Sequence, residues 1–198
     1  MLATATTLGS GVPTLVRANN TIGYFLPAMG GLYGQVQVAA GEGVSGGKYL
    51  GGRIGYAAGP VNVAGAWSKN DKTLAMVDDY SDMNIGASFN MGFMTLMGNM
   101  SKREYAAFDQ KTILIGATVP MGAGTFKASY VKSSGSAPAP TVDAFDATQI
   151  SLGFVYDLSK RTAVYTHLAR VNNDGNATTG GAFAIGGGPA GMRRGETS

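Results

Sequence analysis

The chain has 198 residues and no cysteine, which excludes disulfide frameworks, thiolate chemistry and Cys-based zinc sites. Lys and Arg total 15 against 12 Asp and Glu, and charged residues are only 14% of the chain, where soluble domains carry about 25%. No window reaches the roughly 18 apolar residues of a transmembrane helix, and Lys and Arg are spread singly. We therefore expect neither a helical membrane protein nor a nucleic-acid partner.

Alternation of apolar and polar residues with a period of two begins at Asn20 and recurs down most of the chain. It is clearest in residues 84–91, where Ile85 and Phe89 oppose Asn84 and Ser88. Such two-faced runs are typical of half-covered β-strands. The expected strands are residues 20–26, 32–40, 49–58, 61–68, 84–91, 93–101, 112–119, 125–131, 148–157 and 162–171.

The connections between these strands alternate in length. Short turns are expected near Met29, Pro60, Gly92, Gly122 and Ser159. The longer segments are residues 41–47, 69–83, 102–110 and 132–147. Strict alternation puts all short turns at one end, which predicts an all-β fold, an antiparallel up-and-down barrel of about ten strands. A β-sandwich with Greek-key connections would not sort loop length by end.

The composition of the two faces indicates what covers them. The polar sides carry Asn, Gln, Ser, Thr, Tyr and Gly with few charges, which suits a wet lumen better than an open surface. The apolar side then meets lipid, and Tyr24, Tyr56, Phe126 and Tyr156 project from it near short turns as an aromatic girdle would. Ordinary strand propensity of aromatic residues is the alternative explanation.

Several motifs resemble the trimeric general-diffusion porins of Gram-negative outer membranes, especially those of β-proteobacteria. They are RANNTIGYFLP, GGLYGQVQVAAGEG, LGGRIGYAAGPVNVAGAW, IGATVPMGAGTFKASYVK and LGFVYDLSKRTAVYTHLARV, and the resemblance covers roughly residues 15–172. It implies a sixteen-stranded transmembrane barrel whose third loop folds inward. Residues 1–18 are then the end of the constricting loop or a disordered lead, and residues 19–171 hold about ten strands. Residues 172–198 are a long Gly-rich extracellular loop that stops before the closing strand.

The resemblance implies a passive channel for small hydrophilic solutes and ions in the cell outer membrane, without cofactor, metal or enzyme activity. Its expected partners are outer-membrane lipid and lipopolysaccharide. A homotrimer is expected of full-length family members and is left open for this chain, in which the N-terminal strands and a signal peptide are not seen. A non-conducting truncated porin and a soluble β-rich binding module remain as alternatives.

The family selects ions by charges at a narrow, water-filled constriction. Arg17 lies where the constricting loop would rejoin the wall, and Arg53 and Lys127 lie on polar faces of their strands. We expect these three residues to form a basic track that favours anions. Isolated solvated cations with no common site are the alternative.

Other patterns have simpler interpretations. Asp78, Asp79 and Asp82 could bind a divalent cation, but a solvated loop is the preferred interpretation. GEGVSGGKY, at 41–49, lacks the spacing and the Ser or Thr of a phosphate loop. His167 is the only histidine and no Gly-x-Ser-x-Gly motif is present, so a wall or rim position is expected for it rather than a catalytic one.

Overall fold

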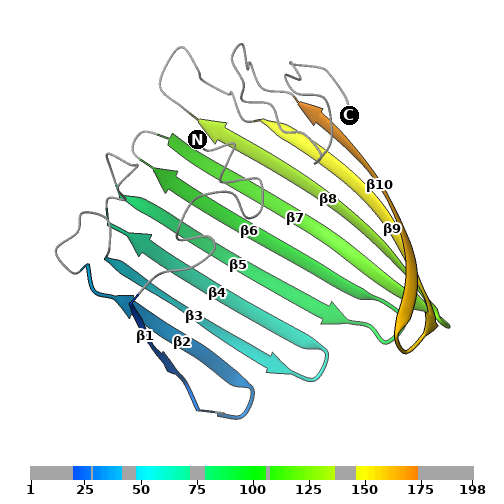
Figure 1. Cartoon of the computed structure of the whole chain (residues 1–198), viewed down its shortest axis with the longest axis horizontal. Coiled ribbons are helices and arrows are strands. Elements are labelled where there is room, and N and C mark those ends of the chain that lie inside the picture. Colours follow the sequence, from blue (N-terminus) through cyan, green and yellow to red (C-terminus); the bar gives the residue numbers. More distant parts are fainter. Residues whose placement is uncertain are drawn as a thin grey trace.

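The structure is a computed structural model that describes residues 20–27, 29–41, 48–71, 79–105, 108–136 and 146–173. Ten antiparallel strands form one sheet in which every strand pairs with its neighbours in the sequence. The strands are β1 (Thr21–Phe25), β2 (Leu32–Ala39), β3 (Tyr49–Ala58), β4 (Val61–Asn70), β5 (Tyr80–Asn90), β6 (Thr95–Tyr105), β7 (Phe108–Met121), β8 (Gly124–Ser136), β9 (Ala147–Ser159) and β10 (Thr162–Asn173). Figure 1 shows a single curved sheet with β1 and β10 at its two edges. The predicted all-β, up-and-down fold is confirmed.

Short turns connect β1 to β2, β3 to β4, β5 to β6, β7 to β8 and β9 to β10, so they all lie at one end of the sheet, called here the turn end. Four of them place glycine at a positive φ, among them Gly59 at 54° and Gly122 at 61°. A side chain at either position would be strained, whereas glycine adopts this conformation readily.

No helix with the length and hydropathy of a membrane span is present in the part of the chain that the structure describes.

The strands extend further than expected at the opposite end, called here the far end. Residues 102–110 were predicted to be a loop, and this prediction is wrong because β6 runs to Tyr105 and β7 begins at Phe108. The many charged residues there had suggested a loop. They are accommodated in the sheet because they contact each other, as in the ion pair between Arg103 Nε and Asp82 Oδ2 at 2.9 Å.

The same extension occurs on other strands. β4 continues to Asn70, β5 begins at Tyr80 and β8 continues to Ser136, all inside segments that were expected to be loops. At the turn end β9 continues to Ser159, so the last turn is Lys160 and Arg161 alone. The ladder of backbone hydrogen bonds therefore reaches beyond the apolar residues from which the strands were recognised.

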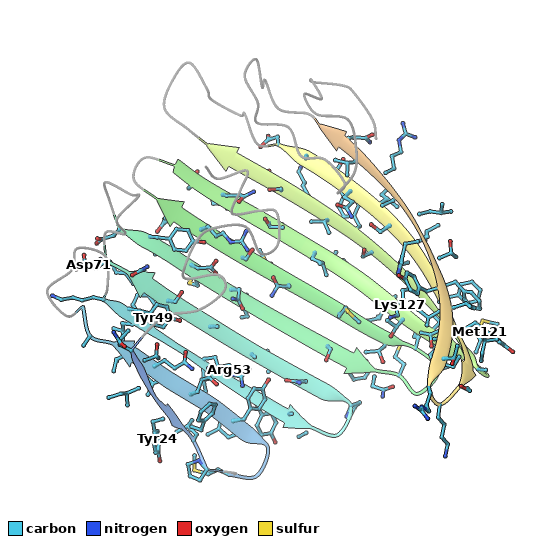
Figure 2. All side chains as sticks on the ribbon, viewed as in Figure 1. Tyr24, Tyr49, Arg53, Asp71, Met121 and Lys127 are labelled. Carbon is cyan, nitrogen blue, oxygen red and sulfur yellow. The ribbon has the colours of Figure 1, made fainter. Side chains whose placement is uncertain are left out.

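The two faces of the sheet differ as predicted. On the outward face large apolar side chains are exposed, among them Ile54 at 59%, Ile85 at 57% and Ile115 at 59%. Figure 2 shows Tyr24 and Met121 outside the curved sheet, whereas Arg53 and Lys127 lie on its hollow, inward face. An apolar surface of this extent is not stable in water and fits a lipid environment.

Candidate functional site

The inward face carries Arg53 on β3, in line with Gln35 on β2 and Ala66 on β4. The guanidinium carbon of Arg53 lies 6.0 Å from the centre of the Tyr33 ring, at the limit of a cation–π contact. Tyr33 in turn donates a hydrogen bond of 2.6 Å from its hydroxyl to Oδ1 of Asn62 on β4. Side chains from three neighbouring strands thus form one polar cluster, in which Tyr33 lies between Arg53 and Asn62.

Gly55 makes this arrangement possible. It pairs with Tyr33 across β2 and β3, and the Tyr33 ring lies over it on the way to Asn62. A Cβ atom at Gly55 would stand 2.7 Å from Cε2 of Tyr33, which is too close for a carbon–carbon contact. Alternation along one strand is sufficient to put Tyr33 on a polar face, but its contact with Asn62 depends on the pairing of three strands.

Lys127 lies on the same face, but the structure does not bring it into contact with Arg53. It is on β8, and the four strands β4 to β7 separate it from β3. Arg53 is near the middle of its strand, five positions before Ala58, whereas Lys127 is nearer the turn end, three positions after Gly124. Arg17, the third residue of the predicted basic track, lies outside the described residues.

His167 shares a row with Lys127, with Gly153 between them on β9. A Cβ atom at Gly153 would stand 2.6 Å from Nδ1 of His167, so the imidazole lies across the glycine toward Lys127. Its ring centre is also 5.5 Å from that of Tyr165. This agrees with a wall position for His167, while its proximity to the row of Lys127 becomes visible only with the strand pairing.

Arg103 differs from Arg53 because its charge is balanced. Its Nε donates to Asp82 Oδ2 at 2.9 Å, and the Tyr80 hydroxyl donates to the same oxygen at 3.4 Å. The Tyr80 side chain is nearly buried, at 3% exposure. In the described strands the other inward-facing charges are Arg53, Lys127 and the exposed Asp157 near the turn end.

The three aspartates that could have bound a divalent cation do not form a metal site in the described part of the chain. Asp82 belongs to β5 and binds Arg103, and Asp79 forms an ion pair of 2.7 Å with Lys69. Asp78 lies outside the described residues. In the part of the chain that the structure describes, no group of three or more His, Asp or Glu side chains could hold a metal ion.

The aromatic residues predicted for the girdle are all exposed on the outward face. Tyr24 is 60% exposed, Tyr56 47%, Phe126 48% and Tyr156 42%. Phe126 and Tyr156 are joined by a further aromatic residue, Phe154, whose ring centre lies 4.5 Å from that of Phe126 and 6.3 Å from that of Tyr156. Phe154 is therefore a further member of this group of outward-facing aromatic residues.

Comparison with known proteins agrees with this geometry. Residues 2–176 match the family described as Gram-negative porin. Outer membrane porin protein 32 of Delftia acidovorans is 33% identical over an alignment of 195 residues that covers 92% of this chain and 54% of the relative. The solved anion-selective porin from Comamonas acidovorans has a TM-score of 0.78 and 29% identity, over 96% of this chain and 60% of that chain.

A more distant structure shares the fold alone. OmpT of Vibrio cholerae, in its trimer form, has a TM-score of 0.61 and 15% identity, over 78% of this chain and 54% of that chain. The architecture and the inward polar face thus define an outer-membrane β-barrel protein. The chain belongs to the Gram-negative porin family. It spans between half and two thirds of the length of the relatives it matches.

Proposed function

We propose that the chain forms part of the wall of a passive outer-membrane channel that admits small hydrophilic solutes and ions and favours anions. The observation that carries this proposal is the unequal pairing of inward charges. Asp82 balances Arg103, whereas Arg53 and Lys127 have no ion-pair partner among the described residues. Against these two cations the described inward face carries one further carboxylate, Asp157 near the turn end, so an excess of positive charge remains that attracts anions and repels cations.

The mechanism needs no covalent step. The outward apolar face shields the backbone ladder from lipid, and the inward face gives water and solutes a polar wall. A permeating ion in bulk-like water gains about 1 kcal/mol from a unit charge at 4 Å, and more where the lumen narrows and the effective dielectric falls. Selection is therefore by size and by charge.

The comparisons support this proposal in coarse terms. The Comamonas acidovorans relative is named an anion-selective porin, and its name states the behaviour that we infer here. We also infer that the outward face contacts outer-membrane lipid and lipopolysaccharide. Assembly into trimers remains a prediction from the family resemblance.

The test is a zero-current potential across a planar bilayer in a KCl gradient. The protein should show an anion-favouring potential, and Arg53→Glu should shift it toward cations, with a larger shift when it is combined with Lys127→Glu. Arg170→Glu is a matched single-charge control for Arg53→Glu, because Arg170 is also an exposed strand arginine but lies on the outward face. An unchanged potential in the double variant would contradict the role of the two residues.

A further inference from the structure

A groove of about 660 Å³ runs across the outward face over β3 to β7. Its floor is low where Gly52 and Gly65 have no side chain. Apolar side chains form its walls, among them Ile54, Trp67, Met83 and Ile113. The groove is therefore an apolar depression in a surface that faces lipid, and its chemistry fits an acyl chain.

Lys102 on β6 and Lys111 on β7 line the groove toward the far end, where they stand directly opposite each other in the sheet. Lys132 on β8 pairs with Ile113, which places it diagonally next to Lys111 on the same face. Lys111 is therefore within about 8 Å of each of the other two lysines, counted between positions on adjacent strands. These three residues are called the lysine cluster.

The charges in the lysine cluster are incompletely balanced. Lys102 forms an ion pair with Glu104, and the nearby Asp109 carboxylate, two positions before Lys111 on β7, also interacts with it electrostatically. Lys111 and Lys132 are exposed and have no ion-pair partner among the described residues. Like charges directly opposite each other destabilise a sheet, so an anion between them would be stabilising.

The lysine cluster lies at the depth of a membrane interface. Lys111 is ten positions from Met121, the turn-end residue of β7, which is about 33 Å along the strand and about 25 Å along the membrane normal for the usual tilt. This equals the height of the apolar band of outer-membrane barrels. Lysine ammonium groups at that level reach the phosphates of lipid headgroups while their stems remain on apolar surface.

We propose that the groove and the lysine cluster together form a docking site for a phosphorylated lipid. An acyl chain lies in the groove beside Trp67, and the headgroup phosphate lies among Lys102, Lys111 and Lys132. This deepens the lipid contact proposed above and rests on it, but it is independent of conduction.

Trp67 provides a direct readout because it is the only tryptophan of the chain and lines the groove. Bromine atoms on an acyl chain quench tryptophan fluorescence on contact. The protein, folded in zwitterionic detergent micelles, is titrated with phosphatidic acid that carries brominated acyl chains and, separately, with brominated phosphatidylcholine. We expect phosphatidic acid to quench Trp67 at concentrations at least tenfold lower, since each lysine near a membrane surface contributes about fivefold to anionic-lipid affinity.

The Lys111→Gln, Lys132→Gln variant should lose most of that difference. Its matched control is Lys160→Gln, Arg161→Gln, which removes two positive charges at the turn end and should retain the difference. Equal quenching of the unmodified protein by both lipids would overturn the proposal, as would an undiminished preference in the variant. Protection of Trp67 from both lipids would also overturn it, because a second copy of the chain would then cover the groove. Planar-bilayer currents, measured separately, show whether the proposed channel function fails independently.

Discussion

Tyr33 and Gly55 face each other across β2 and β3, and the Tyr33 ring occupies the space that any side chain at residue 55 would need. This contact positions Tyr33 between Arg53 and Asn62, with the Arg53 guanidinium carbon 6.0 Å from the ring centre and the hydroxyl 2.6 Å from Oδ1 of Asn62. A residue without a side chain therefore determines the surroundings of a proposed selectivity residue.

Gly55→Ala should displace the Tyr33 ring and break its hydrogen bond to Asn62. Overpacking of this kind costs about 1–3 kcal/mol in the free energy of unfolding, which urea titration in micelles with Trp67 fluorescence can measure. Gly65→Ala on β4 is the matched control, because a Cβ there meets only Asn84 O at an ordinary 3.7 Å. Equal stability of the two variants would show that the Tyr33–Gly55 contact is not restrictive.

Asp82→Asn should have two separable effects. It removes the partner of the half-buried Arg103, which should lower the free energy of unfolding by about 1–3 kcal/mol, and it frees a third inward cation, which should increase anion preference. Zero-current potentials in a KCl gradient measure the second effect.

Arg103→Gln should move the potential in the opposite direction, because it leaves the Asp82 carboxylate unbalanced. The Asp82→Asn, Arg103→Gln double variant should return the potential to the starting value. A double variant that keeps the shift of Asp82→Asn would mean that the pair does not act through its charge.

The sequence was sufficient for the strands and their faces but not for the contacts between strands. Alternation within one strand depends only on neighbours in the chain, so the turn-end half of the sheet, where apolar residues alternate regularly, was predicted closely. The far end was not, since Lys102, Arg103 and Glu104 resemble a loop until their partners on adjacent strands are known.

The same limit applies to the candidate site. Arg53 and Lys127 were recognised as inward cations from parity alone, and the structure places both on the inward face. The contact of Arg53 with Tyr33 and the approach of His167 to the row of Lys127 can be predicted only when the register of the neighbouring strands is known. A single sequence does not supply that register, because glycines such as Gly55 and Gly153 carry no apolar signal.

The assignment of the two faces can be tested on one strand. Ile115 and Leu114 are adjacent on β7, and the pairing of Ile115 with Tyr130 and of Leu114 with Val131 puts them on opposite faces. Ile115→Lys places a charge in lipid and should cost about 2–4 kcal/mol, whereas Leu114→Lys faces the lumen and should cost much less. The free energy of unfolding in lipid vesicles decides this. Similar costs at both positions would favour a soluble module in which neither face meets lipid.

Phe154 should contribute more to stability than either of its aromatic neighbours. Its ring contacts Phe126 at 4.5 Å and Tyr156 at 6.3 Å, whereas each of those residues has only Phe154 as a ring partner among the described residues. At about 0.5–1.5 kcal/mol for each aromatic pair, Phe154→Ala should lower the free energy of unfolding by about 1–3 kcal/mol. Phe126→Ala and Tyr156→Ala should each remove roughly half as much.

Phe93→Ala is the control for this series, because Phe93 is 66% exposed in a turn and has no ring contact among the described residues. Its loss should change the unfolding free energy by no more than about 0.5 kcal/mol. If Phe93→Ala and Phe154→Ala were equally costly in lipid vesicles, contact of single rings with the interface would explain the effect, and the three-ring cluster would contribute nothing of its own. A larger loss for Phe154→Ala that persists in detergent micelles would instead locate the stabilisation in the ring pairs, since those contacts do not depend on headgroups.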